Sequence, residues 1–263
     1  MHVPKPMNFT EQQILSTLAS FIWPFMRISS MFISLPIFSV KALPAKVRVM
    51  TAFLITLVVV PVLPNTSNVD IFSYPGFMVT IQQVAIGLST GFVLQMVFSV
   101  MMLGGQSIAY SMGLGFASMV DPATGIQTPV VAQVFVVSAS LLFLAVNGHL
   151  LLIEMLVESF TTLPIAVVGL SMDDLWSIII WSSQIFAAAV LLAMPVMAAL
   201  LFINISFGVA ARAAPQLQIF GVGLPITIML GMVLIWMSLS SVLDVFSDVL
   251  TEAFKLINQL LKL

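Results

Sequence analysis

The sequence predicts an all-α membrane protein, and three observations support this class. Hydrophobic residues make up 60% of the 263 positions and charged residues only 7%, and the mean hydropathy is +1.18. Soluble domains carry about 25% charged residues, so these few charges cannot cover a water-exposed surface. Several apolar stretches also reach the roughly 20 residues with which a helix crosses about 30 Å of hydrocarbon. The chain is therefore expected to lie in a bilayer or to have its apolar faces covered by partner subunits.

The apolar stretches divide the chain into about six helical segments. A terminal stretch, Asp244–Leu263, places charged and apolar residues at helical spacing, so it should continue the last segment as an amphipathic tail. The six segments are Ile14–Phe38, Val47–Leu63, Phe77–Leu103, Pro129–Ile153, Leu175–Phe207 and Gly221–Leu243.

Composition and missing motifs exclude several function classes. The net charge of -2 provides no basic surface, which disfavours nucleic-acid binding. The chain has no cysteine and only two histidines, which excludes disulfides and both thiolate and histidine-cluster metal sites. It also lacks a lysine-containing phosphate loop, an HExxH motif and a GxSxG motif. No catalytic residue, metal or cofactor is expected, and an enzyme is disfavoured.

The connector Gly104–Thr128 differs from an ordinary loop. It holds five of the fourteen glycines and a single charge, Asp121, among many apolar residues. A solvated loop is normally polar. Irregular glycine-rich backbone at membrane depth is tolerated only where it is buried in protein or lines a cavity. We therefore expect this connector to be irregular and enclosed by protein.

Three large apolar side chains of the connector, Met112, Phe116 and Met119, share one face at helical spacing. They could form a soft constriction, since methionine repacks readily and hydrophobic constrictions close pores by dewetting. The alternative is ordinary packing against neighbouring helices. Spacing alone favours packing, because apolar residues at helical spacing usually belong to a core.

Arg27 lies in the middle of the first apolar segment. A charge at that depth costs about 2.5–3.5 kcal/mol on insertion scales. No acid of the same segment lies one turn away, so a partner must come from another helix or another chain. Two interpretations stay open: extension of the side chain to the interface on the side of Lys41 and Lys46, and pairing between subunits.

Four stretches, in order along the chain, resemble the FliR/SctT family of type III secretion export-gate subunits, and the third is closest to the flagellar branch. They are Gly105–Ala109 with Met112–Ala117 and Asp121-Pro122; Phe143–His149 with Ser159-Phe160 and Pro164; Ala210–Leu217; and Gly223–Ile226.

The resemblance implies a fold and a set of partners. It implies a FliP-like helical part over residues 1–174 and a FliQ-like helical hairpin with an amphipathic tail over 175–263, so that some predicted spans would be hairpins packed on partner chains. It further implies a core export gate built with FliP and FliQ, an association with FlhB, and transit of unfolded flagellar subunits. The expected location is the bacterial inner membrane, in contact with lipid, in the flagellar basal body, with part or most of the assembly raised toward the periplasm.

The resemblance also implies roles for single residues. In the family, the connector that matches Gly105–Asp121 acts as a plug across the pore. The implied plug or gate residues are Tyr110, Met112, Gly113, Gly115, Phe116, Met119 and Asp121. Separately from the resemblance, Arg27, Arg212 and Pro215 are expected to contribute to contacts between subunits and to assembly.

The alternative function is a small-molecule or ion transporter of the inner membrane. Such a protein would carry ionisable residues at mid-depth and inverted repeats. Only Arg27 fits that description, so the sequence favours a structural and gating subunit of an export channel.

Overall fold

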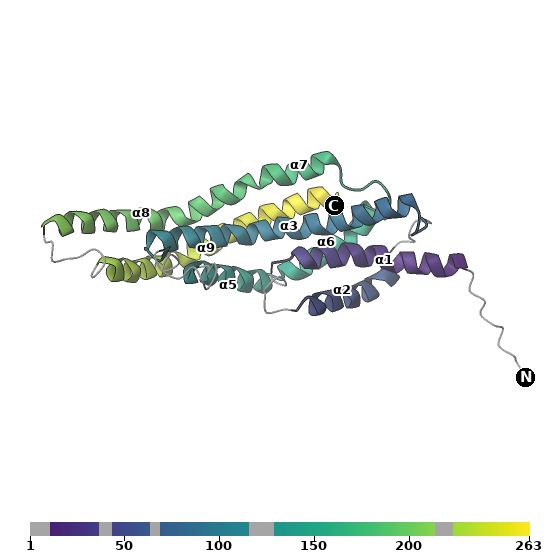
Figure 1. The fold of residues 1–263 in the computed structure, drawn as a ribbon, viewed down its shortest axis with the longest axis horizontal. Helices are drawn as coiled ribbons and strands as arrows, with labels where there is room; N and C mark the ends of the chain where they lie inside the picture. Colours follow the sequence, from purple (N-terminus) through teal and green to yellow (C-terminus); the bar gives the residue numbers. More distant parts are fainter. Residues whose placement is uncertain (1–10, 37–43, 64–68, 116–128, 214–222) are drawn as a thin grey trace, which may run out of the picture. The chain divides into compact units, whose positions relative to one another are not determined.

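The computed structural model describes residues 11–36, 44–63, 69–115, 129–213 and 223–263, and every regular element in these ranges is a helix (Figure 1). The prediction of an all-α fold is confirmed. The elements are α1 (Glu11–Ser34), α2 (Ala45–Val59), the 3-10 helix η1 (Val60–Val62), α3 (Tyr74–Ser111), α5 (Val130–Ala145), α6 (Gly148–Thr162), α7 (Met172–Trp181), α8 (Ser183–Ala213) and α9 (Leu224–Leu261).

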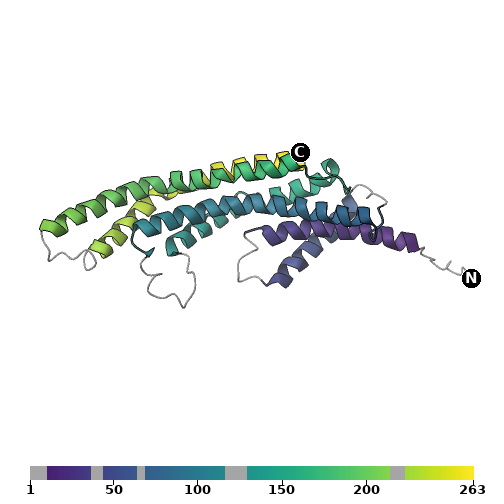
Figure 2. The same cartoon turned by 45° about the horizontal axis from the view of Figure 1, so that its top comes forward.

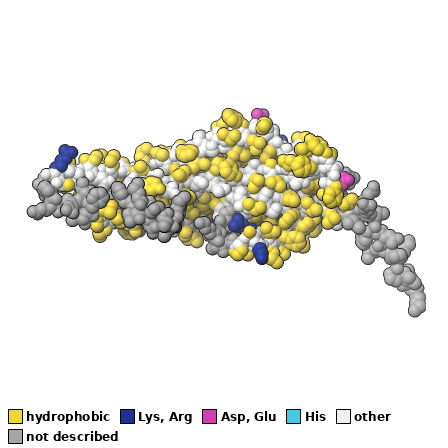
Figure 3. All heavy atoms as spheres, in the orientation of Figure 1, with side chains coloured by type: hydrophobic (Ala, Val, Ile, Leu, Met, Phe, Trp, Pro, Cys, Tyr) yellow, Lys and Arg dark blue, Asp and Glu magenta, His cyan; other side chains and the backbone are white. Residues whose placement is uncertain are grey.

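The described helices agree with a membrane protein. Four stretches are long and apolar enough to cross a bilayer, namely Ala45–Val62, Tyr74–Ser111, Met172–Arg212 and Leu224–Leu261. A fifth span results if α5 and α6, which are bent by 63° at a short break, count as one. Helix α1, which carries Arg27, is not among these stretches. Figure 3 shows hydrophobic side chains over most of the described surface on one face, with charged side chains at a few points.

Three departures of the helices from the predicted segments bear on the fold. The fourth segment breaks at Val146-Asn147, where Asn147 takes a left-handed φ of 56°. The fifth divides at Ser182 into α7 and α8. The third continues as regular helix to Ser111, so the expectation of irregular backbone from Gly104 onward is wrong for residues 104–111. The predicted continuation of the last segment into the amphipathic tail is confirmed, because α9 is one helix.

The chain forms two compact units that do not follow chain order. Unit 1 contains residues 1–95, 149–178 and 255–263, and unit 2 contains residues 96–148 and 179–254. Helix α3 therefore supplies residues 74–95 to unit 1 and 96–111 to unit 2. The division into a FliP-like part and a FliQ-like hairpin stays a prediction.

In unit 1, α1 packs closely on α3 and is flanked by α2 (Figure 2). A Cβ added at Gly87 of α3 would overlap the carbonyl oxygen of Arg27 and the hydroxyl of Ser30, both on α1. Such close approach of helices through small residues is typical of membrane proteins. On the side of α2, the rings of Phe21 and Phe53 meet edge-on with centroids 5.2 Å apart.

Unit 2 is organised around Phe98 of α3. Its ring lies edge-on to Phe143 of α5, with centroids 5.9 Å apart, and to Phe246 of α9, with centroids 5.5 Å apart. Further along α3, a Cβ at Gly105 would lie 2.6 Å from the Cα of Ala132 in α5. This contact explains why a glycine lies inside α3. Because Gly105 has no side chain, the neighbouring helix can approach closely, and the residue does not mark a loop.

Candidate functional site

Helix α3 ends in a Schellman motif that lies within the predicted plug segment Gly105–Asp121. Gly113 takes a left-handed φ of 84°. Its amide donates to the carbonyl of Tyr110, and the amide of Leu114 donates to the carbonyl of Ala109, both at 3.0 Å. These two bonds are the ones that define the motif, and glycine is favoured at the left-handed position because it has no Cβ. The structure thus gives Gly113 a specific task, which is to stop α3.

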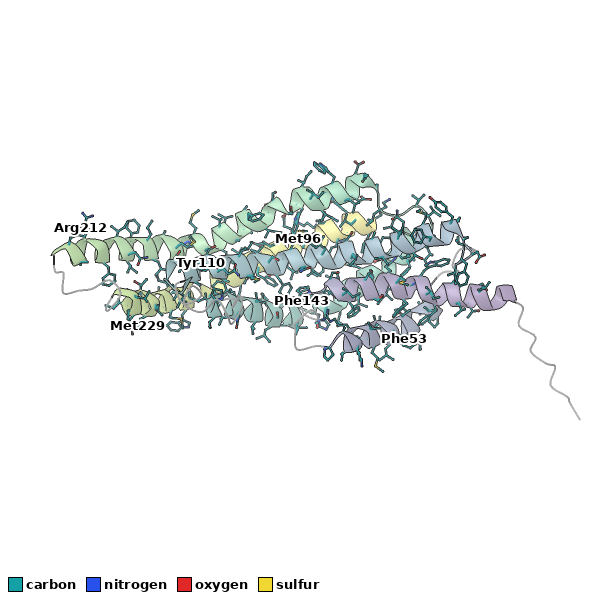
Figure 4. The ribbon with its side chains drawn as sticks, viewed as in Figure 1. Phe53, Met96, Tyr110, Phe143, Arg212 and Met229 are labelled. Carbon is teal, nitrogen blue, oxygen red and sulfur yellow. The ribbon has the colours of Figure 1, made fainter. Side chains whose placement is uncertain are left out.

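The side chains at this end of α3 point in different directions. Met112 is fully buried, with 0% of its surface exposed. Its side chain packs against Gly231 of α9 so closely that a Cβ added at Gly231 would lie only 2.7 Å from it. Tyr110, which is labelled in Figure 4, is 58% exposed. Its ring lies beside Gly115. Met112 is therefore packed within its own chain, which matches the packing alternative for that residue.

A groove of about 510 Å³ runs between the end of α3 and the middle of α8. Its walls are mostly apolar, and its polar groups come from the C-terminal turns of α3 and from Asn204 of α8. The lining residues are Ser107, Tyr110, Ser111, Val190, Met194, Met197, Ala198, Leu201 and Asn204.

Asn204 connects three helices at the end of this groove. Its amide nitrogen donates to the carbonyl of Ser111 in α3 at 3.3 Å. Its amide oxygen accepts from the hydroxyl of Thr227 in α9 at 3.4 Å. The single proton of this hydroxyl is shared with the carbonyl of Gly223, four residues earlier in the chain, which is the closer acceptor at 2.9 Å.

Arg27 lies in the interior of unit 1, with 0% of its surface exposed. Its Nε donates to the side-chain oxygen of Gln83 in α3 at 2.7 Å. Nη1 donates to the carbonyl and hydroxyl oxygens of Ser159 at 3.1 and 2.9 Å, and Nη2 donates to the carbonyl of Leu163 at 2.8 Å. The guanidinium carbon also lies 4.1 Å from the ring centroid of Phe160.

The charge of Arg27 is thus stabilised by neutral acceptors at the C-terminal end of α6, where the helix dipole favours a cation. The partners come from other helices, as the sequence required, and the side chain is buried in unit 1. The intersubunit contact of Arg27 stays a prediction.

The remaining predicted residues are placed as follows. Arg212 is exposed in the last turn of α8, at its far end in Figure 4. Phe116, Met119, Asp121 and Pro215 lie outside the described residues. Among the residues that the structure does describe, no group of three or more acidic residues or histidines could hold a metal ion.

Sequence reasoning missed the polar partners that build these sites. Gln83 and Ser159 carry no motif, and two of the acceptors of Arg27 are main-chain carbonyls, which any residue provides. Asn204 had a usable signal, because it is an amide in the middle of a long apolar run, and such residues in a membrane segment usually have a partner.

Comparisons with known proteins agree with this picture. Residues 18–253 match the family described as bacterial export proteins, family 1. The flagellar biosynthetic protein FliR of Escherichia coli strain K12 is 35% identical over 95% of this chain and 96% of its own length. FliR of Pectobacterium carotovorum is also 35% identical, over 94% of this chain and 98% of its own. FliR of Bacillus subtilis strain 168 is 27% identical over 95% and 97%.

Proposed function

Because this chain belongs to family 1 of the bacterial export proteins, we propose that it serves as a subunit of the flagellar protein export apparatus in the inner membrane. In that apparatus it forms, with FliP and FliQ and in association with FlhB, the channel that unfolded flagellar subunits cross. The family is one of export proteins and not a known family of enzymes. The assembly is raised partly toward the periplasm.

The observation that carries this proposal is the apolar surface that unit 2 leaves open. Phe202 of α8 is 73% exposed, and Met229 and Trp236 of α9 are 70% and 78% exposed. Large exposed apolar patches mark interaction surfaces. Packed helices of partner subunits would cover these side chains as well as lipid does, and a subunit of a helical channel needs such contacts on several sides.

The plug is the second part of the proposal. In this proposal the segment that follows α3 closes the pore, and Phe116, Met119 and Asp121 are among its plug residues. The burial of Met112 supports a role for this residue as the anchor of the segment, and the exposure of Tyr110 leaves that ring free to contact the plug or a partner.

The transporter alternative rested on Arg27. Its guanidinium bonds Gln83, Ser159 and Leu163 of its own chain, so it is not offered to a substrate. The hydrogen bonds of Arg27 between helices of its own chain account for this buried charge, and no transported ion is needed to explain it.

The proposed assembly is tested by purifying the tagged chain in mild detergent, with and without co-expressed FliP and FliQ, and measuring native mass. We expect one defined complex that holds all three proteins. A chain that stays well behaved alone and retains neither partner would contradict the proposal.

The plug is tested separately, in liposomes that hold the assembled complex. Deletion of Gly113–Val120 should let small ions leak through a complex that is sealed in its unaltered form. A deletion complex of the same subunit composition that stays sealed would remove the plug from the proposal.

A further inference from the structure

We propose that α2 of unit 1 is a lipid-facing helix, and that Lys46 and Arg48 at its beginning bind the phosphate headgroup of an anionic phospholipid. This inference rests on the inner-membrane location proposed above, and it assigns the face of one helix to one class of ligand. The apolar stretch Ala45–Val62 has 18 residues. At 1.5 Å per residue it is about 27 Å long, close to the roughly 30 Å of a hydrocarbon core.

One narrow side of α2 faces its own chain. The buried residues of the helix are Ala52, Thr56 and Val59, which share one side at this spacing. Beside them, the ring of Phe53 (Figure 4) meets the ring of Phe21 of α1. Two of the three buried residues are small, and contacts between helices in membranes are enriched in small residues because these let two backbones approach.

The rest of the surface of α2 is exposed and apolar. Val49–Val62 contains no charged residue. Its large apolar side chains point outward: Leu54 is 58% exposed and Val58 is 71% exposed, and Met50 and Leu57 are exposed in the same way. Small residues toward the protein and large apolar residues away from it are the distribution expected of a helix whose outer face meets acyl chains.

The polar side chains of α2 are satisfied within the helix. Between its basic residues and its end, α2 has two of them, Thr51 and Thr56. Their hydroxyls donate to the carbonyls of Val47 at 2.9 Å and Ala52 at 2.7 Å, so neither proton is available to a partner protein. The exposed face of α9 differs, because it presents Trp236, a residue whose ring nitrogen can donate to a partner.

Both cations of α2 lie at its beginning. Lys46 is exposed and Arg48 is half-buried, and the sequence from 44 to 63 contains no acidic residue. Figure 3 shows cationic side chains next to hydrophobic ones where α2 begins. Lysine and arginine are enriched at the cytoplasmic ends of membrane helices, where the anionic lipids of the inner leaflet attract them. Charge complementarity therefore selects an anionic phospholipid for this end of the helix.

The lipid face is tested on the complex with FliP and FliQ, in vesicles of phosphatidylcholine mixed with phosphatidylglycerol. The chain contains no cysteine, so a spin label on Leu54→Cys or Val58→Cys is unique once partner cysteines are replaced. Collisions of the label with oxygen, which concentrates in hydrocarbon, and with a water-soluble nickel chelate identify its surroundings. Met229→Cys on α9 is the matched site, since Met229 is 70% exposed and Val58 is 71% exposed.

We expect the two labels on α2 to collide often with oxygen and rarely with the nickel chelate, as a label among acyl chains does. The label on Met229→Cys, which the proposed function places against a partner helix, should collide rarely with both. Rare collisions with both reagents on α2 would show that protein covers this face, and frequent collisions with the chelate would show water. Either result would overturn the lipid-facing assignment.

The headgroup site is tested by lipid retention. Native mass spectra of the complex released from the same vesicles count the bound phosphatidylglycerol. Replacing both Lys46 and Arg48 by glutamine should lower the occupancy of one phosphatidylglycerol per copy of the chain by at least about tenfold, since each cation near an anionic surface contributes to binding. The control replaces Lys255 and Lys262, two exposed cations of the same unit, by glutamine and should retain this lipid.

Equal phosphatidylglycerol counts in the two double variants would overturn the headgroup site. If the Lys46 and Arg48 double variant does not assemble, Lys46→Gln alone decides by the same count. Failure of this inference is separable from failure of the proposed function. A complex of all three proteins whose α2 labels avoid oxygen would keep the export subunit and overturn the lipid-facing helix. Labels among acyl chains on a chain that retains neither FliP nor FliQ would uphold that helix and reject the export complex.

Discussion

The Nη2 atom of Arg27 donates a hydrogen bond of 2.8 Å to the carbonyl oxygen of Leu163, although the two residues are 136 positions apart in the chain. This bond, with those to Gln83 and Ser159, joins α1, α3 and the end of α6 through one buried cation. The stability of unit 1 should therefore depend on this side chain.

Replacement of Arg27 by methionine should lower the stability of the chain by at least ~2 kcal/mol, because buried acceptors at the end of α6 lose their donors. Thermal melting of the purified complex in detergent measures the effect. Lys46→Met is the control: it removes an exposed cation of the same unit and should leave the melting temperature unchanged. Equal melting temperatures for both variants would show that the Arg27 bonds contribute little.

Gly87→Ala should push α1 and α3 apart, since the new Cβ would overlap the carbonyl of Arg27 and the hydroxyl of Ser30. We expect a loss of about 2 kcal/mol, typical of an overpacked contact. Gly208→Ala makes the same change in α8, where the added Cβ meets nothing within 4 Å, and should be neutral or stabilising by up to about 1 kcal/mol. The melting temperature should fall with Gly87→Ala and should stay unchanged or rise with Gly208→Ala. An unchanged melting temperature for Gly87→Ala would argue against the close α1–α3 contact.

Gly113→Ala should destabilise the end of α3 by roughly 1–2 kcal/mol, because a residue with a Cβ is strained at the left-handed φ of 84°. Hydrogen exchange at the amides of Gly113 and Leu114, which make the two bonds of the motif, should become faster. Gly113→Asn should have a smaller effect, as asparagine tolerates this conformation better. Protection that stays the same in the alanine variant would mean that the motif is not what ends the helix.

Arg212→Ala should lower the yield of the complex with FliP and FliQ about tenfold, which corresponds to the loss of one charged hydrogen bond. The yield is measured by quantitative pull-down, and motility of a host that lacks its own copy of the protein should fall with it. Arg212→Lys keeps the charge and should retain part of the yield. Unchanged yield and motility for the alanine variant would end the assembly role of Arg212.

The sequence was sufficient to predict the helices because hydropathy reports which stretches avoid water, and α9 with its amphipathic end shows this well. It was misleading at Gly104 and Gly105. In soluble proteins glycine breaks helices, but here Leu192 and Ala132 of neighbouring helices occupy the space that a side chain would need. The break at Asn147 depends on the conformation of one residue, which periodicity over a longer window does not resolve.

The candidate sites could be predicted only in part, for a similar reason. Arg27 was identified because a charge in the middle of an apolar segment is costly to insert. Its acceptors lie far away in the chain and are common groups, so no sequence pattern reveals them. Met112 shared a helical face with Phe116 and Met119, yet spacing cannot tell a face that meets a pore from one that meets another helix. In the structure Met112 contacts Gly231 of α9, and its role in a gate stays a prediction.

Unit 1 is built from both ends of the chain, and this has a consequence for biosynthesis. The hydroxyl of Thr162 donates at 2.6 Å to the carbonyl of Leu261, and Ile257 and Leu261 are buried. Residues 255–263 thus belong to the same unit as α1 and α2, although the ribosome makes them long after those helices. Unit 1 cannot close co-translationally in the order in which its parts emerge. Its early helices must wait, with apolar surface uncovered, in the insertion machinery or the bilayer until α9 has been synthesised and has returned to α6.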